Sequence, residues 1–543
     1  MSQWSVTDAA CTFLGQSFSV ARTLLVFIVV THSIVTDAMG QSASARWARG
    51  VGGIDDDYGW SVATDAGRNV YVAGYFTALA AVGPTNFTSY GGSDIFLVKY
   101  DHNGNPLWAT RAGGATNDQG RAVVTDAAGD VYLTGHFRGV GTFGTTNLVS
   151  HGAEDMFLAK LDASGRWLWT STAGGTNTDE ARSVAIDGAG NCYVTGVFFG
   201  SAGFGTNVVT SRGQMDVVVA KANAGGEWLW ARSFGGAAFD ESRGMAVTAS
   251  GECYVTGYFN GTAEFPGTNL VSRGGADIFV AKFGTNGDLL WVQQAGGTDA
   301  DEGHAVVLDT AGNLHLTGGF AGTANIFGTN VSAQGFVGSM DVFLVKLDAD
   351  GQPIWFQRGT GSSHDAGNAI GLDAEGDVYV SGLFVGSASF GSQRLTSTSG
   401  QADVFFVKYN RDGDFLWAFQ AGGPAYMSGN GLGVDSEGSA YGTGFYRSST
   451  SVGGISLTNS SFARDAFIVR VDGPPRLRIT SSDAQVVLVW PTWANGYQLQ
   501  SSVGVGGTNT WAVVTNVPAN QGEERQVAPG TPGQRRFFRL RSP

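Results

Sequence analysis

Seven positions along the chain carry side chains of different kinds at one recurring spacing, and several of them could bind an anionic group. Each lies thirteen residues after a recurring tryptophan; the positions are Trp60, Arg121, Arg182, Arg243, His304, Asn368 and Asn430. Guanidinium groups suit carboxylates and phosphates because of their planar, forked donors. Since the neighbouring positions repeat while this one varies, packing does not dictate it. We expect a ligand-binding site here, with pairing between the arginines and nearby aspartates as the alternative.

A series of carboxylates stands three residues before these positions. Its members are Asp57, Asp118, Asp179, Asp240, Asp301 and Asp365, with Met427 in the seventh place. Six carboxylates on one rim would suit a cation such as calcium. The alternative, which we favour, is that each aspartate accepts backbone N–H bonds where the chain enters the next repeat. No other cofactor is expected.

Catalysis would need an asymmetric group of acids and bases. His136 replaces a repeated tyrosine near a strand end, where we expect solvent access, and His304 could act beside Asp240 or Asp301 if they converge. We find no nucleophile elbow, zinc-binding helix or phosphate loop. The sequence therefore favours a non-enzymatic binding or scaffolding protein. A polysaccharide lyase or hydrolase is the alternative.

The elements that position these residues follow from an internal repeat. Tryptophans recur at Trp47, Trp108, Trp169, Trp230, Trp291, Trp355 and Trp417, and each stretch also holds a version of the run DIFLVK. A period near 60 residues indicates a repeat architecture rather than one large core. The chain therefore contains seven repeat units.

Each unit contains four short runs rich in β-branched and aromatic residues, bounded by glycine and aspartate turns. The runs are continuously apolar, as in residues 95–98, so both faces of each sheet should be covered. Sheets stacked around an axis meet that demand. We predict an all-β, seven-bladed β-propeller with four-stranded blades, in which the N-terminal strand around residues 45–48 completes the last blade.

Other repeated residues are expected to serve the blades. Asp155 and Lys160 of one DxFxxK run point to opposite faces of their strand, and the tryptophans should dock between blades. Cys192 and Cys253 occupy equivalent strand positions about 10 Å apart, too far for a disulfide. The connections of about 17 to 20 residues, such as 138–154, either form a working surface or pack through a shared F-G-T-N core with Phe143, Phe204 and Phe265.

The unit D-x-x-G-N-x-Y-V-x-G-x-F, followed by F-G-T-N and G-x-D-x-F-x-x-K, resembles the bacterial seven-bladed β-propeller repeat over residues 46–473. It is distantly similar to NHL repeats. This resemblance implies the fold and an extracytoplasmic setting but no shared catalytic chemistry. The run D-x-x-G-x-x-L-W also resembles the tryptophan docking motif of quinone-dependent dehydrogenases, but the longer period and the lack of an adjacent cysteine pair argue against that class.

The two ends of the chain differ from the repeat. Residues 1–45 resemble a signal peptide and leader, with Ala43 to Ala45 or Ala38 to Gly40 as cleavage sites. Residues 474–543 contain about five short strands and suggest a small C-terminal β-sandwich. With a net charge of -14, the chain should not bind nucleic acid. We expect an exported monomer without a transmembrane segment, which binds a protein or a polysaccharide.

Overall fold

The structure is a computed structural model that describes residues 42–459, 461–475, 477–482, 485–494, 497–502, 511–522, 524–528 and 537–541. Within these residues the chain is all-β apart from one 3-10 turn, η1 (Thr492–Ala494). The apolar run of the predicted signal peptide lies outside the described residues. None of the described helices is long and apolar enough to span a membrane.

The sequence repeats fold into four-stranded antiparallel units in which consecutive strands pair. The first three units are β2 (Tyr58–Thr64), β3 (Val70–Val82), β4 (Thr85–Tyr100) and β5 (Pro106–Gly114); β6 (Gln119–Thr125), β7 (Val131–Phe143), β8 (Thr146–Leu161) and β9 (Trp167–Gly175); and β10 (Asp179–Ile186), β11 (Cys192–Phe204), β12 (Asn207–Ala222) and β13 (Trp228–Gly236). The next three are β14 (Glu241–Val247), β15 (Cys253–Phe259), β18 (Asp277–Phe283) and β19 (Leu289–Gly297); β20 (Asp301–Leu308), β21 (Leu314–Ala321), β24 (Met340–Leu347) and β25 (Pro353–Gly361); and β26 (Ala366–Leu372), β27 (Val378–Val385), β30 (Ala402–Tyr409) and β31 (Phe415–Ala421).

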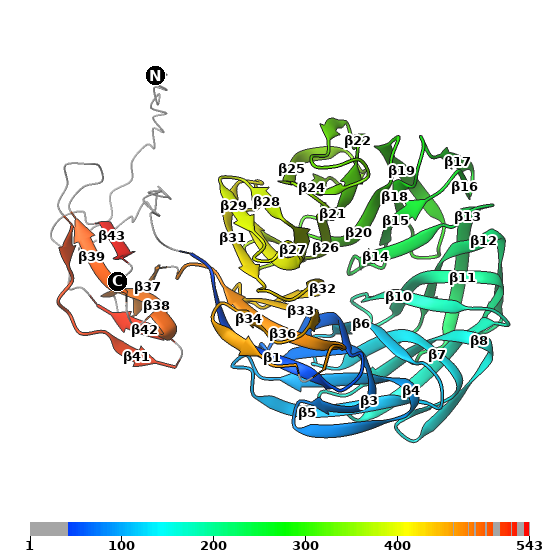
Figure 1. Cartoon of the computed structure of the whole chain (residues 1–543), viewed down its shortest axis with the longest axis horizontal. Coiled ribbons are helices and arrows are strands. Elements are labelled where there is room, and N and C mark those ends of the chain that lie inside the picture. Colours follow the sequence, from blue (N-terminus) through cyan, green and yellow to red (C-terminus); the bar gives the residue numbers. More distant parts are fainter. Residues whose placement is uncertain are drawn as a thin grey trace, which may run out of the picture.

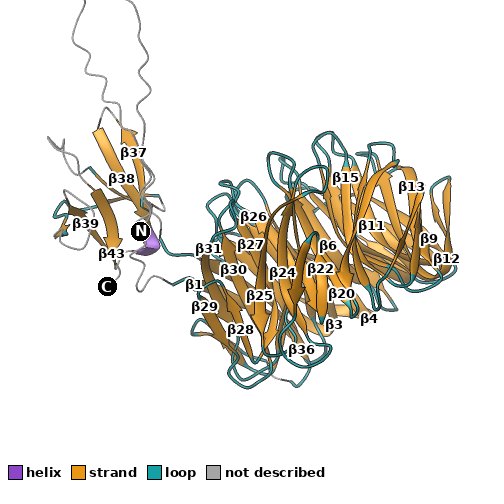
Figure 2. Cartoon of the chain, turned by 90° about the horizontal axis from the view of Figure 1, so that it is seen from above, coloured by secondary structure: helices purple, strands orange, loops and turns teal. Residues whose placement is uncertain are grey.

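The last unit joins the two ends of the repeat region. It consists of β32 (Met427–Val434), β33 (Ala440–Arg447), β36 (Arg464–Asp472) and β1 (Ser44–Gly53). Strand β1 pairs antiparallel with β36, with Ala48 opposite Val469, which confirms that the N-terminal strand completes this unit. The units form a propeller-like ring, with first strands such as β6, β14 and β26 nearest the middle (Figure 1), and their strands cross its thickness (Figure 2).

The third strands show why the units stack. Every residue of β18, β24 and β30 is buried, so both faces of these sheets are covered, as the continuous apolar runs predicted. The tryptophans connect neighbours: Trp47 Nε1 donates to the His102 carbonyl at 2.9 Å, and Trp108 Nε1 to that of Ala163 at 3.1 Å. Lys160 contacts Asp130 at 2.9 Å and lies over the Tyr132 ring, so the DxFxxK lysine serves the blade.

The long connections are β-hairpins. In the first three units they continue strands such as β7 and β8, and in the others they are β16 (Thr262–Phe265) and β17 (Thr268–Val271), β22 (Thr323–Ile326) and β23 (Thr329–Ser332), β28 (Ser387–Phe390) and β29 (Gln393–Thr396), and β34 (Thr450–Val452) and β35 (Ile455–Leu457). Six of them pair with the last strand of the preceding unit, as Gly113 pairs with Thr142. Phe143 is fully buried against Phe157 and Trp167, so the F-G-T-N core packs structurally.

The C-terminal strands form two sheets of their own within the described residues. One contains β37 (Arg478–Ser482), β38 (Gln485–Pro491), β41 (Ala519–Gln521) and β42 (Glu524–Val527); the other contains β39 (Gln498–Ser502), β40 (Ala512–Val513) and β43 (Phe537–Arg541). Both contribute to one small core around Trp490, Leu499 and Leu540.

Cys192 and Cys253 are free, fully buried thiols, which confirms the sequence prediction. Burial raises the pKa of each thiol to about 12. Because only the thiolate reacts, a protein that starts at residue 42 should show no reaction with Ellman's reagent until denaturant is added. Reaction of either thiol at the rate of a free cysteine in native buffer would contradict this packing.

Candidate functional site

The seven variable positions share a local backbone feature. In each unit the pairing register between the first and second strands skips one residue, and the skipped residue is the variable one; between β2 and β3, for example, the register shifts between Gly59 and Ser61. Such a β-bulge turns a side chain away from the regular alternation of the strand. The bulges explain why these side chains leave the stacked sheets.

The bulged side chains meet in one cavity of about 360 Å³, here called the central cavity. All seven residues of the variable series line it, together with Glu241, which the prediction omitted; the lining is Trp60, Arg121, Arg182, Glu241, Arg243, His304, Asn368 and Asn430. The bulge lies at the start of each first strand, opposite the end of the second strand where the long hairpin begins. The central cavity therefore lies on the hairpin face of the ring.

Glutamates, rather than aspartates, pair with the arginines of the central cavity. Arg182 Nη2 lies 3.1 Å from Glu180 Oε2, and Arg243 contacts Glu302 at 2.8 Å and Glu241 at 3.3 Å. These glutamates are not among the residues predicted from the sequence. The sequence does contain a signal for them. In three successive units the rim aspartate is followed directly by a glutamate, and along a strand the glutamate side chain points to the face opposite the aspartate side chain.

His304 is held inside this network. Its Nδ1 lies 3.1 Å from the Gly367 carbonyl oxygen, and its Nε2 lies 2.7 Å from Arg243 Nη1 and 3.0 Å from Glu302 Oε2. Both ring nitrogens are thus engaged within the protein. The predicted partners Asp240 and Asp301 are buried in the joints between units, and Glu302 takes their place beside the imidazole.

The six aspartates of the rim are almost completely buried. Asp118 accepts the N–H groups of Gly114 at 2.6 Å and Arg138 at 2.9 Å, so it joins the last strand of one unit to the second strand of the next. Asp301 does the same with Gly297 and Ala321. These contacts match the role that we favoured for the aspartates, which is to accept backbone N–H bonds where the chain enters the next repeat. The binding of calcium by this series stays a prediction.

His136 does not have the solvent access that we expected, so that part of the prediction is wrong. Its side chain is 6% exposed and is not among the residues that line the central cavity. Burial, followed by the charges of Arg121 and Arg182, lowers its pKa to about 3. Glu180 of β10, in the next unit, lies beside the ring, with its Oε2 3.8 Å from His136 Nδ1.

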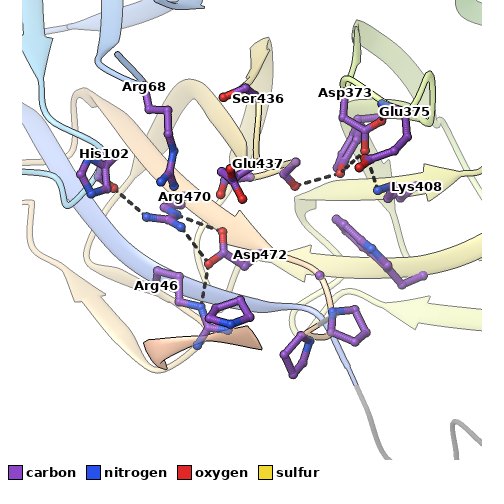
Figure 3. Close-up of a pocket in the computed structure, with 18 of the residues that line it drawn as sticks. Arg46, Arg68, His102, Asp373, Glu375, Lys408, Ser436, Glu437, Arg470 and Asp472 are labelled. Carbon is purple, nitrogen blue, oxygen red and sulfur yellow. Dashed lines mark hydrogen bonds and ion pairs between the residues drawn. The ribbon is translucent and has the colours of Figure 1, made fainter. Parts of the chain in front are cut away.

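A second cavity, of about 990 Å³, lies where the ring closes (Figure 3). Its charges are largely paired within the protein. Asp373, Glu375 and Asp377 come close enough together to hold a metal ion, but the Lys408 ammonium lies 2.8 Å from Asp373 and 2.9 Å from Asp377. The Lys408 ammonium therefore already neutralises part of the charge of this acidic group.

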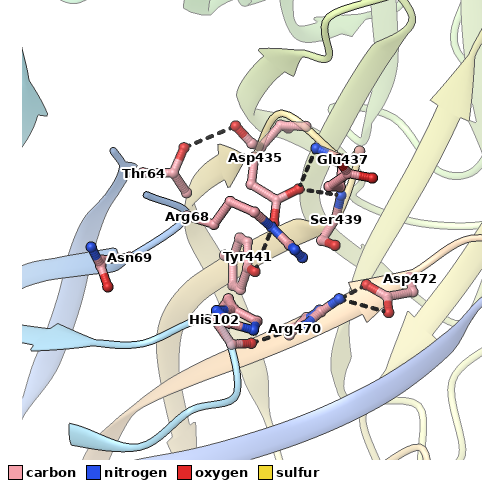
Figure 4. Close-up of polar contacts among 12 residues, drawn as sticks. Thr64, Arg68, Asn69, His102, Asp435, Glu437, Ser439, Tyr441, Arg470 and Asp472 are labelled. Carbon is pink, nitrogen blue, oxygen red and sulfur yellow. Dashed lines mark hydrogen bonds and ion pairs between the residues drawn. The ribbon is translucent and has the colours of Figure 1, made fainter. Parts of the chain in front are cut away.

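Around the same cavity, the network here called the closure seam connects β1 and β36 to neighbouring turns. Arg470 contacts Asp472 at 2.9 Å and donates to the His102 carbonyl, and Arg46 of β1 contacts Asp472 at 3.0 Å. Arg68 contacts Asp435 at 2.9 Å (Figure 4). We assign the closure seam a structural role, because Arg46 and Arg470 converge on Asp472 within the last unit, and the contacts of Arg470 with His102 and of Arg68 with Asp435 join that unit to the first.

Comparisons with known proteins identify relatives of low identity. No family model matches the chain. An uncharacterized WD repeat-containing protein, L264 of Acanthamoeba polyphaga mimivirus, is 24% identical over 79% of this chain and 38% of its own length. The regulatory protein FlaEY of Caulobacter vibrioides is 26% identical over 68% of this chain and 41% of its length. The chain thus spans about two fifths of these curated relatives.

Solved structures show more distant likeness. A PL25 ulvan lyase matches with a TM-score of 0.41 and 12% identity, covering 73% of this chain and 93% of the lyase. Sqt1 of Chaetomium thermophilum matches with a TM-score of 0.37 and 7% identity, covering 83% of this chain and 97% of Sqt1. The repeat, the strand pairing and the WD-repeat relative together identify the chain as a β-propeller repeat protein.

Proposed function

We propose that the chain is an exported, non-enzymatic, seven-bladed β-propeller that recognises a protein or a polysaccharide on its hairpin face, with the central cavity as the point of recognition. The observation that carries this proposal is the set of β-bulges, which bring seven non-equivalent side chains into one cavity. The rim aspartates and the DxFxxK residues, in contrast, repeat from unit to unit and serve the blades. Concave sites with a few convergent polar groups are typical ligand sites.

The chemistry of the central cavity favours binding over catalysis. Burial raises the pKa of Glu302, but the hydrogen bond with His304 and the charge of Arg243 outweigh it and lower the pKa to about 2. Such a carboxylate is a weak base and a poor proton donor near neutral pH. The carboxyl groups with raised pKa values are buried in the joints between units. A polysaccharide lyase or hydrolase would need an acid or base that contacts the ligand.

Export is part of the proposal, and the structure bears on where a signal peptidase would cut. Cleavage after Ala45 would remove Ser44 and Ala45, which pair with Asp472 and Val471 of β36. Cleavage after Gly40 would leave β1 intact. We therefore propose the earlier site, a monomeric extracytoplasmic protein, and residues 474–543 as an accessory β-sandwich.

Binding and catalysis can be separated in one experiment. Residues 42–543 are passed over immobilised acidic and neutral polysaccharides, and the same mixtures are assayed for new sugar ends. We expect an immobilised polysaccharide to retain the protein without the appearance of new sugar ends. Changing Arg121, Arg182 and Arg243 together to glutamine should weaken binding about a hundredfold, since buried charged contacts are lost.

The control for this experiment is Arg138→Gln, because the Arg138 side chain is 54% exposed and lies outside the central cavity. It should bind like the natural protein, and circular dichroism should show both variants folded. Release of sugar ends would contradict a binding-only role. Retention on no polysaccharide would leave a protein as the proposed partner.

A further inference from the structure

The central cavity is divided into two unequal halves. In the half around Arg243, the charged groups contact one another closely: Arg243 lies 2.8 Å from Glu302 and 3.3 Å from Glu241. Asn368 donates to the Gly429 carbonyl at 2.8 Å. Burial lowers the pKa of Arg243, but the two glutamates outweigh it and raise the pKa above the usual value. This half satisfies itself and leaves little for a ligand to add.

The half around Trp60, Arg121 and Arg182 is different. Buried donor atoms without a hydrogen-bond partner among the described residues gather there: Trp60 Nε1, Arg121 Nε and Arg182 Nε. His136 Nδ1, which also lacks a hydrogen bond, lies beside them, 3.8 Å from Glu180 Oε2. Two acceptors, Gln119 Oε1 and Glu180 Oε2, also lack a hydrogen bond, although Glu180 Oε2 forms ion pairs. Buried polar atoms normally have partners, so this concentration of donors points to a ligand.

The charges in this half are also out of balance. Arg121 and Arg182 share one glutamate, Glu180, whose Oε2 lies 3.7 Å from Arg121 Nη2 and 3.1 Å from Arg182 Nη2. Arg182 reaches Glu241 only at 3.7 Å. Burial and the neighbouring charge of Arg182 lower the pKa of Arg121 to about 10, although Glu180 raises it. An added anion would restore the balance.

Aromatic rings continue from this half across the first and last units. The Arg121 guanidinium lies 4.2 Å from the Trp60 ring centroid, and Trp60 stacks on Tyr58 at 5.7 Å. Tyr58 in turn contacts Tyr75 at 4.9 Å and Phe445 at 4.5 Å. All of these rings are half-buried, so part of each faces solvent.

This aromatic group, here called the platform (Tyr58, Trp60, Tyr75 and Phe445), belongs to one sector of the ring only. At the position of Tyr58 the other units have residues without an aromatic ring: Gln119, Glu180, Glu241, Glu302, Ala366 and Ser428. Half-exposed rings bind apolar faces of ligands while neighbouring donors fix orientation. The platform and the unpartnered donors are therefore two parts of one asymmetric site.

We propose that this half of the central cavity binds a uronic acid unit of an acidic polysaccharide, with its carboxylate on Arg121 and Arg182 and its ring against the exposed edge of Trp60. This inference rests on the proposed binding function. Guanidinium forks match the planar carboxylate, and a pyranose ring offers apolar C–H groups to the exposed part of the platform. An acidic peptide would supply the carboxylate, but its extended chain has no equivalent flat face.

The test compares one backbone with and without its carboxylate charge, and adds a sulfated chain of another backbone. Binding of residues 42–543 is measured by calorimetry, in EDTA, against oligogalacturonate, its methyl ester and a sulfated dextran. We expect oligogalacturonate to bind at least tenfold more tightly than the ester or the sulfated chain. Arg121→Gln should weaken oligogalacturonate binding about thirtyfold or more while leaving binding of the ester nearly unchanged.

Two further variants keep the test decisive. Trp60→Ala replaces a half-exposed ring, so it should fold, and it should weaken both galacturonate ligands; Arg138→Gln should change neither. Equal binding of acid and ester, or full binding by Arg121→Gln, would overturn the inference while leaving a binding protein in place. No binding of any polysaccharide by the natural protein would overturn both this inference and the polysaccharide form of the proposed function.

Discussion

Asp472→Asn should lower the free energy of unfolding by about 3 to 5 kcal/mol, because it removes the carboxylate that the closure seam shares. Asp472 accepts from Arg470 Nε at 2.9 Å and Nη2 at 3.1 Å, and from Arg46 Nε at 3.0 Å. Its side chain is 7% exposed and that of Arg470 is 10% exposed. An amide would remove the charge of the carboxylate that contacts the buried Arg470 guanidinium and would weaken the contact with Arg46. Urea unfolding, followed by far-UV circular dichroism, measures the loss.

The matched control is Asp162→Asn, at the equivalent position of the second unit. Asp162 contacts Arg166 at 3.0 Å, but the Arg166 side chain is 75% exposed, and exposed ion pairs add little stability. Asparagine can still accept the turn N–H bonds that Asp162 receives from Ser164 and Arg166. Equal losses in the two variants would show that the closure seam contributes no more than an ordinary turn.

Much of the fold follows from local patterns in the sequence. Tryptophan spacing defines the units, continuous apolar runs predict sheets covered on both faces, and an unpaired strand around Trp47 predicts the closure by β1. These features repeat, so each unit confirms the interpretation of the others. The same logic identified the buried aspartates and the docking tryptophans as parts of the blade.

The central cavity was only half predictable, because its geometry depends on register. The sequence shows that Arg121, Arg182 and Arg243 vary where their neighbours repeat, but not that each occupies a β-bulge. Because the bulge shifts the alternation of side chains along the strand, alternation alone does not predict which side chains meet in the cavity. The paired glutamates were missed, and His136 was expected in solvent, for the same reason.

Raising the pH from 5 to 8 should lower the unfolding midpoint of the propeller. Burial raises the pKa of the rim aspartates, which lie in the joints between units, to about 7 for Asp118 and Asp301 and to about 8 for Asp57 and Asp365. Their backbone hydrogen bonds act in the opposite direction but are outweighed. In the unfolded chain these groups ionise near pH 4. Between these values the folded state holds more protons than the unfolded state, so stability falls as the pH rises.

The size of the effect follows from proton linkage. Each carboxyl that stays protonated in the folded state and ionises in the unfolded state reduces stability by about 1.4 kcal/mol per pH unit across its window. The loss should slow once the pH passes the folded-state pKa values. Carboxyl groups with lowered pKa values, such as Glu302, titrate below pH 5 and do not affect the trend. His136 and His315, whose pKa values burial lowers to about 3 and about 4, offset part of it up to about pH 6.5, so the net loss should be steepest above that pH. Thermal unfolding at pH 5, 6, 7 and 8 and constant ionic strength measures the slope.

Asp365→Asn isolates one joint. Asp365 Oδ1 accepts from Val385 N at 3.0 Å, while Oδ2 has no hydrogen-bond partner among the described residues, so the amide can keep the contact without a charge. Met427 shows that an uncharged residue serves at the equivalent position of the last unit. The variant should show a shallower dependence on pH and greater stability at pH 8. An unfolding midpoint that rises from pH 5 to 8 would contradict protonated aspartates in the joints. A gain in stability on adding calcium chloride at pH 8 would instead support a cation bound by these aspartates.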